Sequence, residues 1–288
     1  MHHFENQVAV ITGAAGGLGL ALAHHAASLG MKLVLADVDA AALAVAVDGL
    51  SADGTEVLGV VTDVSDSAQL EALAAASMQR YGKVHLLFNN AGVGAGGLIW
   101  ENSANDYQWV FGVNVAGVLN GLRAFVPLML AHGEAAHIVN TASVAGMLAA
   151  PALGLYNASK HAVVGLTETL YNDLKLVGAQ VSCSVLCPAY FDTGIADSER
   201  TRPATLRNQA PLTDSQRATL AQLHKAVKSG KLGAAEIAAQ TFEAIRHDQF
   251  YILTHAAIKP AIALRAEDIA LERNPSDVFT HKPQLKPH

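Results

Sequence analysis

The chain has 288 residues, of which 51% are hydrophobic and 15% are charged, so it can bury a large core and does not fit the disordered class. Its 19 Lys and Arg residues against 25 Asp and Glu residues give a formal net charge of −6 at pH 7, with the positive charges scattered along the sequence. That distribution makes nucleic acid and anionic membranes poor partners. The N-terminus has neither the basic start nor the apolar core of a signal peptide, and no uninterrupted apolar stretch reaches the roughly 18 residues of a membrane span, so we expect a cytoplasmic protein.

Short apolar runs alternate with longer helical patterns along the chain, which is typical of a parallel sheet with helices on both faces. The runs that we expect to be strands are Val8–Thr12, Lys32–Ala36, Glu56–Val60, Val84–Asn89, Ala136–Asn140, Val181–Leu186 and Phe250–Leu253. Helices are expected between them at 17–29, 39–50, 66–80, 104–132, 155–177 and 234–246. The predicted fold is a single α/β domain with a doubly wound, Rossmann-like sheet of seven parallel strands.

Two segments break the alternation. Residues 189–233 contain no predicted strand and one helix near 214–229, and they follow the end of a strand, where open α/β sheets bind ligands. We therefore expect a substrate lid at about 189–233, inside a dinucleotide-binding catalytic domain that covers residues 1–255. Residues 256–288 are expected to form a C-terminal extension with a helix at 259–272 and a tail.

The first predicted strand leads directly into a glycine-rich loop, Gly13–Gly19, and then into a helical pattern. Its glycines at 13, 17 and 19 allow a tight turn, close approach of the backbone to a pyrophosphate, and tight packing of the helix on the strand. This context indicates a loop that cradles phosphate groups.

Asp37 closes the second predicted strand 18 residues after Gly19, close to the offset at which an acidic residue meets the ribose hydroxyls of a dinucleotide. A carboxylate there would repel the 2′-phosphate of NADP, and the nearby residues Gly16 and Val38 offer no cation, so NAD(H) is the predicted cofactor. Alternatively, Asp37 could merely cap the helix that begins near Asp39, although Asp39 could fill that role by itself.

Tyr156 and Lys160 are four residues apart at the start of a predicted helix, so both side chains project from one face. A free phenol has a pKa near 10 and is a poor acid or base at neutral pH. An ammonium group beside it, together with the positive nicotinamide ring of an oxidised cofactor, would lower the pKa of the tyrosine. The spacing alone is uninformative, since such pairs occur on many helices.

Several motifs occur together in the order and spacing of the short-chain dehydrogenase/reductase family, which the chain resembles over about residues 5–255. They are Thr12-Gly13-xxx-Gly17-x-Gly19, Asp63-Val64, Asn89-Asn90-Ala91-Gly92, Asn114, Ser143, Tyr156-xxx-Lys160, and Pro188 with Thr193.

The resemblance implies a set of catalytic roles. Tyr156 is expected to be the general acid/base that exchanges a proton with the substrate oxygen, and Ser143 to hydrogen-bond the same oxygen. Lys160 is expected to lower the pKa of Tyr156 and to bind the nicotinamide ribose. The backbone carbonyl of Asn114 would hold a water that links Lys160 to solvent.

The same resemblance implies a cofactor site. Its expected members are Thr12, Gly13, Gly17, Leu18, Gly19, Asp37, Val38, Asp63, Val64, Asn90, Ala91, Gly92, Tyr156, Lys160, Pro188 and Thr193. Asp63 would contact the adenine ring and Thr193 the nicotinamide carboxamide. The chain departs from the family pattern after Pro188, where Ala189 replaces the usual glycine and Phe191 a smaller aliphatic residue, which puts the local loop shape and the pocket width in doubt.

We expect an NAD-dependent alcohol dehydrogenase or ketone reductase, acting on a secondary alcohol or ketone with an apolar body. The residues expected to bind substrate are Ser143, Val144, Leu153, Tyr156, Tyr190 and Phe191, with Val93, Gly94, Ala145 and Met147 as further candidates for the pocket wall. Because these walls are mostly apolar, a polyol fits less well.

Other enzyme types of this fold match the sequence less well. Enoyl reductases of this fold usually place tyrosine and lysine seven apart, and residue 163 is Val; relatives that act on nucleotide sugars have a different glycine spacing and a larger C-terminal domain. The alternative from a different class is a catalytically silent relative that senses nucleotide or acts as a scaffold. Such a protein would be expected to lack Ser143, Tyr156 or Lys160, and all three are present.

The helices predicted at 104–132 and 155–177 carry apolar residues on more than one face, and relatives commonly pair through these helices, so a homodimer or homotetramer is expected. The two cysteines, Cys183 and Cys187, lie four apart in the apolar run from Val181 to Cys187 and are interpreted as buried free thiols. The 13 histidines show no convincing set of ligands, so no metal is expected.

Overall fold

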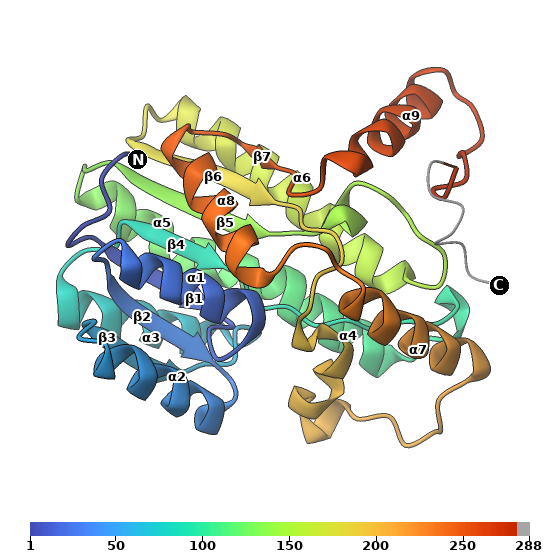
Figure 1. Ribbon diagram of the computed structural model, residues 1–288, viewed down its shortest axis with the longest axis horizontal. Coiled ribbons are helices and arrows are strands. Elements are labelled where there is room, and N and C mark those ends of the chain that lie inside the picture. Colours follow the sequence, from blue (N-terminus) through green and yellow to red (C-terminus); the bar gives the residue numbers. More distant parts are fainter. Residues whose placement is uncertain (281–288) are drawn as a thin grey trace.

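A computed structural model describes residues 1–280 of the chain. Its central element is one seven-stranded parallel sheet (Figure 1). Its strands are β1 (Val8–Thr12), β2 (Lys32–Asp37), β3 (Val57–Val61), β4 (Leu86–Asn89), β5 (Ala136–Thr141), β6 (Val181–Leu186) and β7 (Tyr251–Ile252). They lie in the order β3-β2-β1-β4-β5-β6-β7, so the connections reverse direction between β1 and β4. Open α/β sheets bind ligands at such a switch point. The predicted doubly wound, Rossmann-like fold is confirmed.

Helices cover both faces of the sheet because each strand sends alternate side chains to opposite sides. Ala9 and Ile11 of β1 pack on one face, and Val8 and Val10 pack on the other. The first face is covered by α1 (Gly17–Ser28), α2 (Ala40–Ala52) and α8 (Ala234–Arg246). The second face is covered by α3 (Ser67–Tyr81), α5 (Gly117–Ala131) and α6 (Gly154–Leu176).

The helix expected at 104–132 has an irregular middle. It consists of α4 (Ala104–Phe111), a π-helical turn η2 (Gly112–Ala116) and α5. The apolar pattern predicted one continuous helix and did not reveal the π turn, and such turns are frequent at functional sites. Asn114 lies inside this turn.

Among the described residues, one helical stretch, Ala104–Ala131, is long and apolar enough to cross a membrane by length and composition. The expectation that no such stretch exists considered only uninterrupted apolar runs, and here polar residues interrupt the run. A core helix of a folded domain passes the same test, and α5 packs Phe125 and Met129 against the sheet. The stretch is therefore weak evidence for a membrane span.

The segment after β6 crosses the carboxyl end of the sheet. It contains two short 3-10 turns, η4 (Gly194–Thr201) and η5 (Ala204–Leu206), followed by α7 (Asp214–Lys228), which confirms the helix expected near 214–229. Thr213 caps α7 by accepting a hydrogen bond from the backbone of Gln216.

Beyond β7, the short turn η6 (Ala256–Ile258) leads into α9 (Lys259–Ala270), which projects away from the sheet (Figure 1). Residues 281–288 of the predicted tail lie outside the described residues. Cys183 on β6 and Cys187 just after it are both buried and free, in agreement with the prediction.

Candidate active site

A cavity of about 420 Å³ opens at the carboxyl ends of the central strands. It extends from the glycine loop and the end of β2, past the loop after β4, to the start of α6. The segment after β6 lines its remaining side. This edge of the sheet thus brings together the residues that sequence motifs had singled out one by one.

The glycine loop is shaped by two close contacts. A Cβ atom on Gly19 would lie 2.0 Å from the carbonyl oxygen of Gly13, and a Cβ on Gly13 would lie 2.9 Å from the Cα of Ala91. Gly13 also has a φ of +64°, a conformation that residues with a Cβ rarely adopt. The loop can therefore keep this tight form only with glycine at these positions, and the tight form leads straight into the N-terminus of α1, which favours an anion.

Asp37 lies at the end of β2 and faces the cavity. Its Oδ2 accepts a hydrogen bond from the backbone N–H of Ala15 in the glycine loop, and its Oδ1 accepts one from the N–H of Asp39, both at 3.0 Å. Asp39, not Asp37, caps α2 by accepting from Ala42. The alternative interpretation of Asp37 as a helix cap is therefore wrong, and each carboxylate oxygen keeps acceptor capacity for a ribose hydroxyl.

Thr12 holds two loops together below the cavity. Its buried Oγ1 accepts hydrogen bonds from the backbone N–H groups of Asn90 and Ala91 and donates to the carbonyl of Phe88. The side-chain amide of Asn90 in turn donates to the carbonyl of Thr12 at 3.0 Å. Thr12 was expected to contact the cofactor directly, but it is not among the residues that line the cavity. It instead holds in place the loops that do line it.

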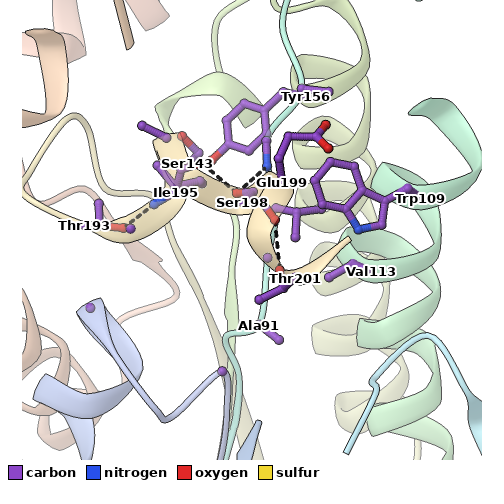
Figure 2. Close-up of a pocket in the computed structure, with 18 of the residues that line it drawn as sticks. Ala91, Trp109, Val113, Ser143, Tyr156, Thr193, Ile195, Ser198, Glu199 and Thr201 are labelled. Atoms are coloured by element: carbon purple, nitrogen blue, oxygen red, sulfur yellow. Dashed lines mark hydrogen bonds between the residues drawn. The ribbon is translucent and has the colours of Figure 1, made fainter. Parts of the chain in front are cut away.

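Ser143, Tyr156 and Lys160 meet at one end of the cavity. Ser143 follows β5, and its side chain accepts a hydrogen bond from Ala145 at the start of a short turn. Tyr156 and Lys160 come from the first turns of α6, as their spacing predicted, with Lys160 Nζ 5.7 Å from the centre of the tyrosine ring. Lys160 Nζ donates to the carbonyl of Thr141 at 2.9 Å. Ser143 and Tyr156 line the cavity together with Ile195 and Ser198 of the segment after β6, and Figure 2 shows these four residues close to one another.

Burial sets the pKa values of Tyr156 and Lys160 at this end of the cavity. The protein packed around the phenol raises the pKa of Tyr156 to about 12, against a smaller lowering by a hydrogen bond with Ser143. Burial lowers the pKa of Lys160 to about 8. In the protein by itself, the cost of burying a phenolate exceeds the lowering by the hydrogen bond with Ser143, so the phenol is not acidic. The prediction named Lys160 together with an oxidised cofactor, and it stays a prediction. A positively charged nicotinamide ring bound in the cavity would add charge that favours the phenolate.

Asn114 stabilises the wall behind Lys160. Its Oδ1 accepts from the backbone N–H of Val93, while its Nδ2 donates to the carbonyl of Val93 and to Ser159 Oγ, at 2.8 to 3.0 Å. The side chain thus ties the π turn to the loop after β4 and to α6. It is buried and does not line the cavity.

Most of the other predicted residues do line the cavity. Besides those already described, they are Gly17, Leu18, Val38, Asp63, Val64, Gly92, Pro188 and Thr193 on the predicted cofactor side, and Val93, Gly94, Val144, Ala145, Leu153, Tyr190 and Phe191 on the predicted substrate side. Met147 lies outside the lining and packs with Val163 and Val164.

Sequence reasoning missed the residues through which the segment 194–202 is fixed over the cavity. Arg202 is buried and forms an ion pair with Asp106 at 2.8 Å. Its guanidinium lies 4.8 Å from the ring centre of Trp109, whose place in the cavity wall is shown in Figure 2. Arg200 pairs with Asp39 at 2.6 Å, so the expectation of no cation near Asp37 is also wrong. The group of arginines between residues 200 and 207 could have drawn attention to this segment. Their partners are far away in the sequence, so the sequence alone did not identify them.

A cleft at the switch point has a glycine loop at a helix N-terminus and a carboxylate at one end, and a serine, a tyrosine and a lysine at the other. These are the parts that a dinucleotide-dependent oxidoreductase requires. The residues that line the cleft fit a dinucleotide.

Comparisons with known proteins agree. The family model described as short chain dehydrogenase matches residues 7–204. The chain is 34% identical over 277 residues to the "CLA biosynthesis dehydrogenase/reductase" of Lactiplantibacillus plantarum, covering 96% of this chain and 97% of that protein. It is 34% identical to the "1-deoxy-11-beta-hydroxypentalenate dehydrogenase" of Streptomyces avermitilis, covering 93% and 91%.

A crystal structure of a short-chain dehydrogenase/reductase from Burkholderia phymatum in complex with NAD is similar throughout. It has a TM-score of 0.95 and 64% sequence identity, and the match covers 96% of this chain and 99% of that one. The chain therefore belongs to the short-chain dehydrogenase/reductase family and is an oxidoreductase of that type. The dinucleotide predicted for this chain is the one bound in the Burkholderia phymatum protein.

Proposed function

We propose that the protein is an NAD-dependent oxidoreductase that interconverts a secondary alcohol and a ketone. The observation that carries the proposal is the meeting of Ser143, Tyr156 and Lys160 at one end of a cavity whose other end presents Asp37. The NAD complex of the similar Burkholderia phymatum protein supports the choice of cofactor, and the name of the Streptomyces avermitilis relative refers to a hydroxylated compound.

NAD, when bound, supplies the acceptor or donor of the hydride. In alcohol oxidation Tyr156 takes the hydroxyl proton, and in ketone reduction it gives a proton to the carbonyl oxygen. Ser143 Oγ donates a hydrogen bond to the same oxygen and stabilises the charge that develops there. Lys160, already held by Thr141, binds ribose hydroxyls and places a positive charge beside the phenol. Thr12 and Asn114 act through the loops that they hold.

The substrate end of the cavity supports an apolar substrate. Leu153, Phe191 and Ile195 line it together with Leu206, Leu220 and Leu223 from the segment after β6. Segment 189–233 acts as a lid over this end, and the apolar wall favours a ketone or alcohol with an aliphatic or aromatic body over a polyol.

The proposal includes a cytoplasmic protein that forms a homodimer or homotetramer. Exposed apolar side chains on the helices expected to pair, such as Tyr107, Leu119 and Leu176, support association of copies. Light scattering that gives the mass of a monomer would count against this part.

The test of the function is an initial-rate assay of the purified protein with NAD⁺ and with NADP⁺ over a panel of alcohols. We expect turnover of secondary alcohols with apolar bodies and a clear preference for NAD⁺, because Asp37 accepts from ribose hydroxyls and repels a phosphate. Turnover confined to polyols would refute the substrate class, and a preference for NADP⁺ would refute the cofactor. Binding of NADH without any turnover would favour the silent, nucleotide-sensing alternative.

A further inference from the structure

The lid crosses the cleft in a fixed path. Ser198 Oγ accepts a hydrogen bond from the backbone N–H of Gly94 at 3.2 Å and donates to the carbonyl of Ile195 (Figure 2). Four residues later the buried Arg202 pairs with Asp106 of α4 and lies over the ring of Trp109. The chain between these two attachments has little freedom, so the position of Arg200 is set by the fold.

Between the attachments, Arg200 reaches the far end of the cleft. Its Nη1 lies 2.6 Å from Oδ2 of Asp39, and Arg200 lines the same cavity as Asp37 and Val38. Asp39 uses its other oxygen, Oδ1, to cap α2, and its backbone N–H donates to Asp37. Arg200 and the predicted ribose-binding carboxylate of Asp37 therefore both line the cavity, and Asp39, which is not a lining residue, connects them through its ion pair and its backbone N–H.

The charge balance at this end depends on that pairing. Among the described residues that line the cavity, the Lys and Arg side chains are Lys160 and Arg200, and Lys160 lies at the opposite end beside Tyr156. Arg200 is thus the cation available to an anionic group near Asp37. Its side chain is 58% exposed, so the guanidinium has room to turn toward another anion once Asp39 carries no charge.

We propose that Asp39 and Arg200 together determine the discrimination between NAD and NADP, with Asp39 holding the guanidinium away from the position of a 2′-phosphate. This inference rests on the proposed use of NAD. With Asp39 neutral, Arg200 pairs with the 2′-phosphate and offsets its repulsion by Asp37, so affinity for NADP rises. Asp37 alone, the residue that the sequence identified, is one part of the selectivity.

The test is a double-mutant cycle read by binding. NADH and NADPH are titrated into the wild type, Asp39→Asn, Arg200→Met and the double variant, with nucleotide fluorescence as the readout and thermal unfolding as the check of folding. Asparagine caps a helix as well as aspartate does, so Asp39→Asn removes the charge and keeps the start of α2. The wild type is expected to bind NADH more tightly than NADPH.

In Asp39→Asn the ratio of the NADPH to the NADH dissociation constant is expected to fall by about tenfold, the size of one gained charge–charge contact. In the double variant the fall is expected to disappear. An unchanged ratio in Asp39→Asn overturns the inference, and so does a fall that persists in the double variant, because the effect would then not pass through Arg200. A wild type that prefers NADPH refutes the proposed cofactor itself, which separates the two failures.

Discussion

Replacing Tyr156 with phenylalanine is expected to lower kcat by about 10³-fold, the usual size of a general acid/base contribution, while NADH binds as in the wild type. Phenylalanine keeps the aromatic ring in the cavity lining and removes only the oxygen that exchanges the proton. The dissociation constant of NADH, measured by fluorescence titration, separates the loss of chemistry from loss of the cofactor.

The matched control is Tyr190→Phe, which removes a second phenol from the lining of the same cavity. We expect that variant to change KM more than kcat, because Tyr190 has no cation beside it among the contacts described for residues 1–280. Retention of more than a tenth of the wild-type kcat in Tyr156→Phe would exclude Tyr156 as the acid/base.

The second large effect is expected for Gly19→Ala. The new Cβ would lie 2.0 Å from the carbonyl oxygen of Gly13 and 2.8 Å from Asn90 Nδ2, so the loop has to move. Overpacking of this kind costs about 1–3 kcal/mol of unfolding free energy. Because the same loop forms the anion site, NADH affinity is expected to fall with the stability. Chemical denaturation and NADH titration measure the two effects.

Gly49→Ala is the control for a glycine replaced within a helix. Gly49 is exposed in α2, and a Cβ there would meet no atom within 4 Å. We expect its stability to rise by about 0.5–1 kcal/mol, since alanine is a better helix former than glycine. Wild-type NADH affinity in Gly19→Ala would show that the tight form of the loop is not required for binding.

Local patterns in the sequence predicted the parts of the site that lie close together along the chain. The glycine loop follows β1 directly, Asp37 ends the next strand, and Tyr156 and Lys160 share one helix face because of their spacing. Period and spacing decide these features, so the fold and most of the lining residues could be predicted.

What the sequence left out depends on contacts between distant segments or on burial. Arg200 and Asp39 are 161 residues apart, and nothing near either residue indicates the pairing. The π turn around Asn114 lies inside what the apolar pattern predicted as one continuous helix. The raised pKa of Tyr156 follows from protein packed around the phenol, which spacing does not report.

The central claim is that Lys160 and the bound oxidised cofactor together make a buried phenol acidic. It is tested most directly by titrating tyrosine absorbance with pH, as the difference between the wild type and Tyr156→Phe, with and without NAD⁺. Packing raises the pKa of Tyr156 to about 12 in the protein alone, so without NAD⁺ the difference signal should show no phenolate up to pH 10. With NAD⁺ the same signal should develop below pH 10, since a nearby positive charge favours phenolate. A signal that NAD⁺ leaves unchanged would contradict the account.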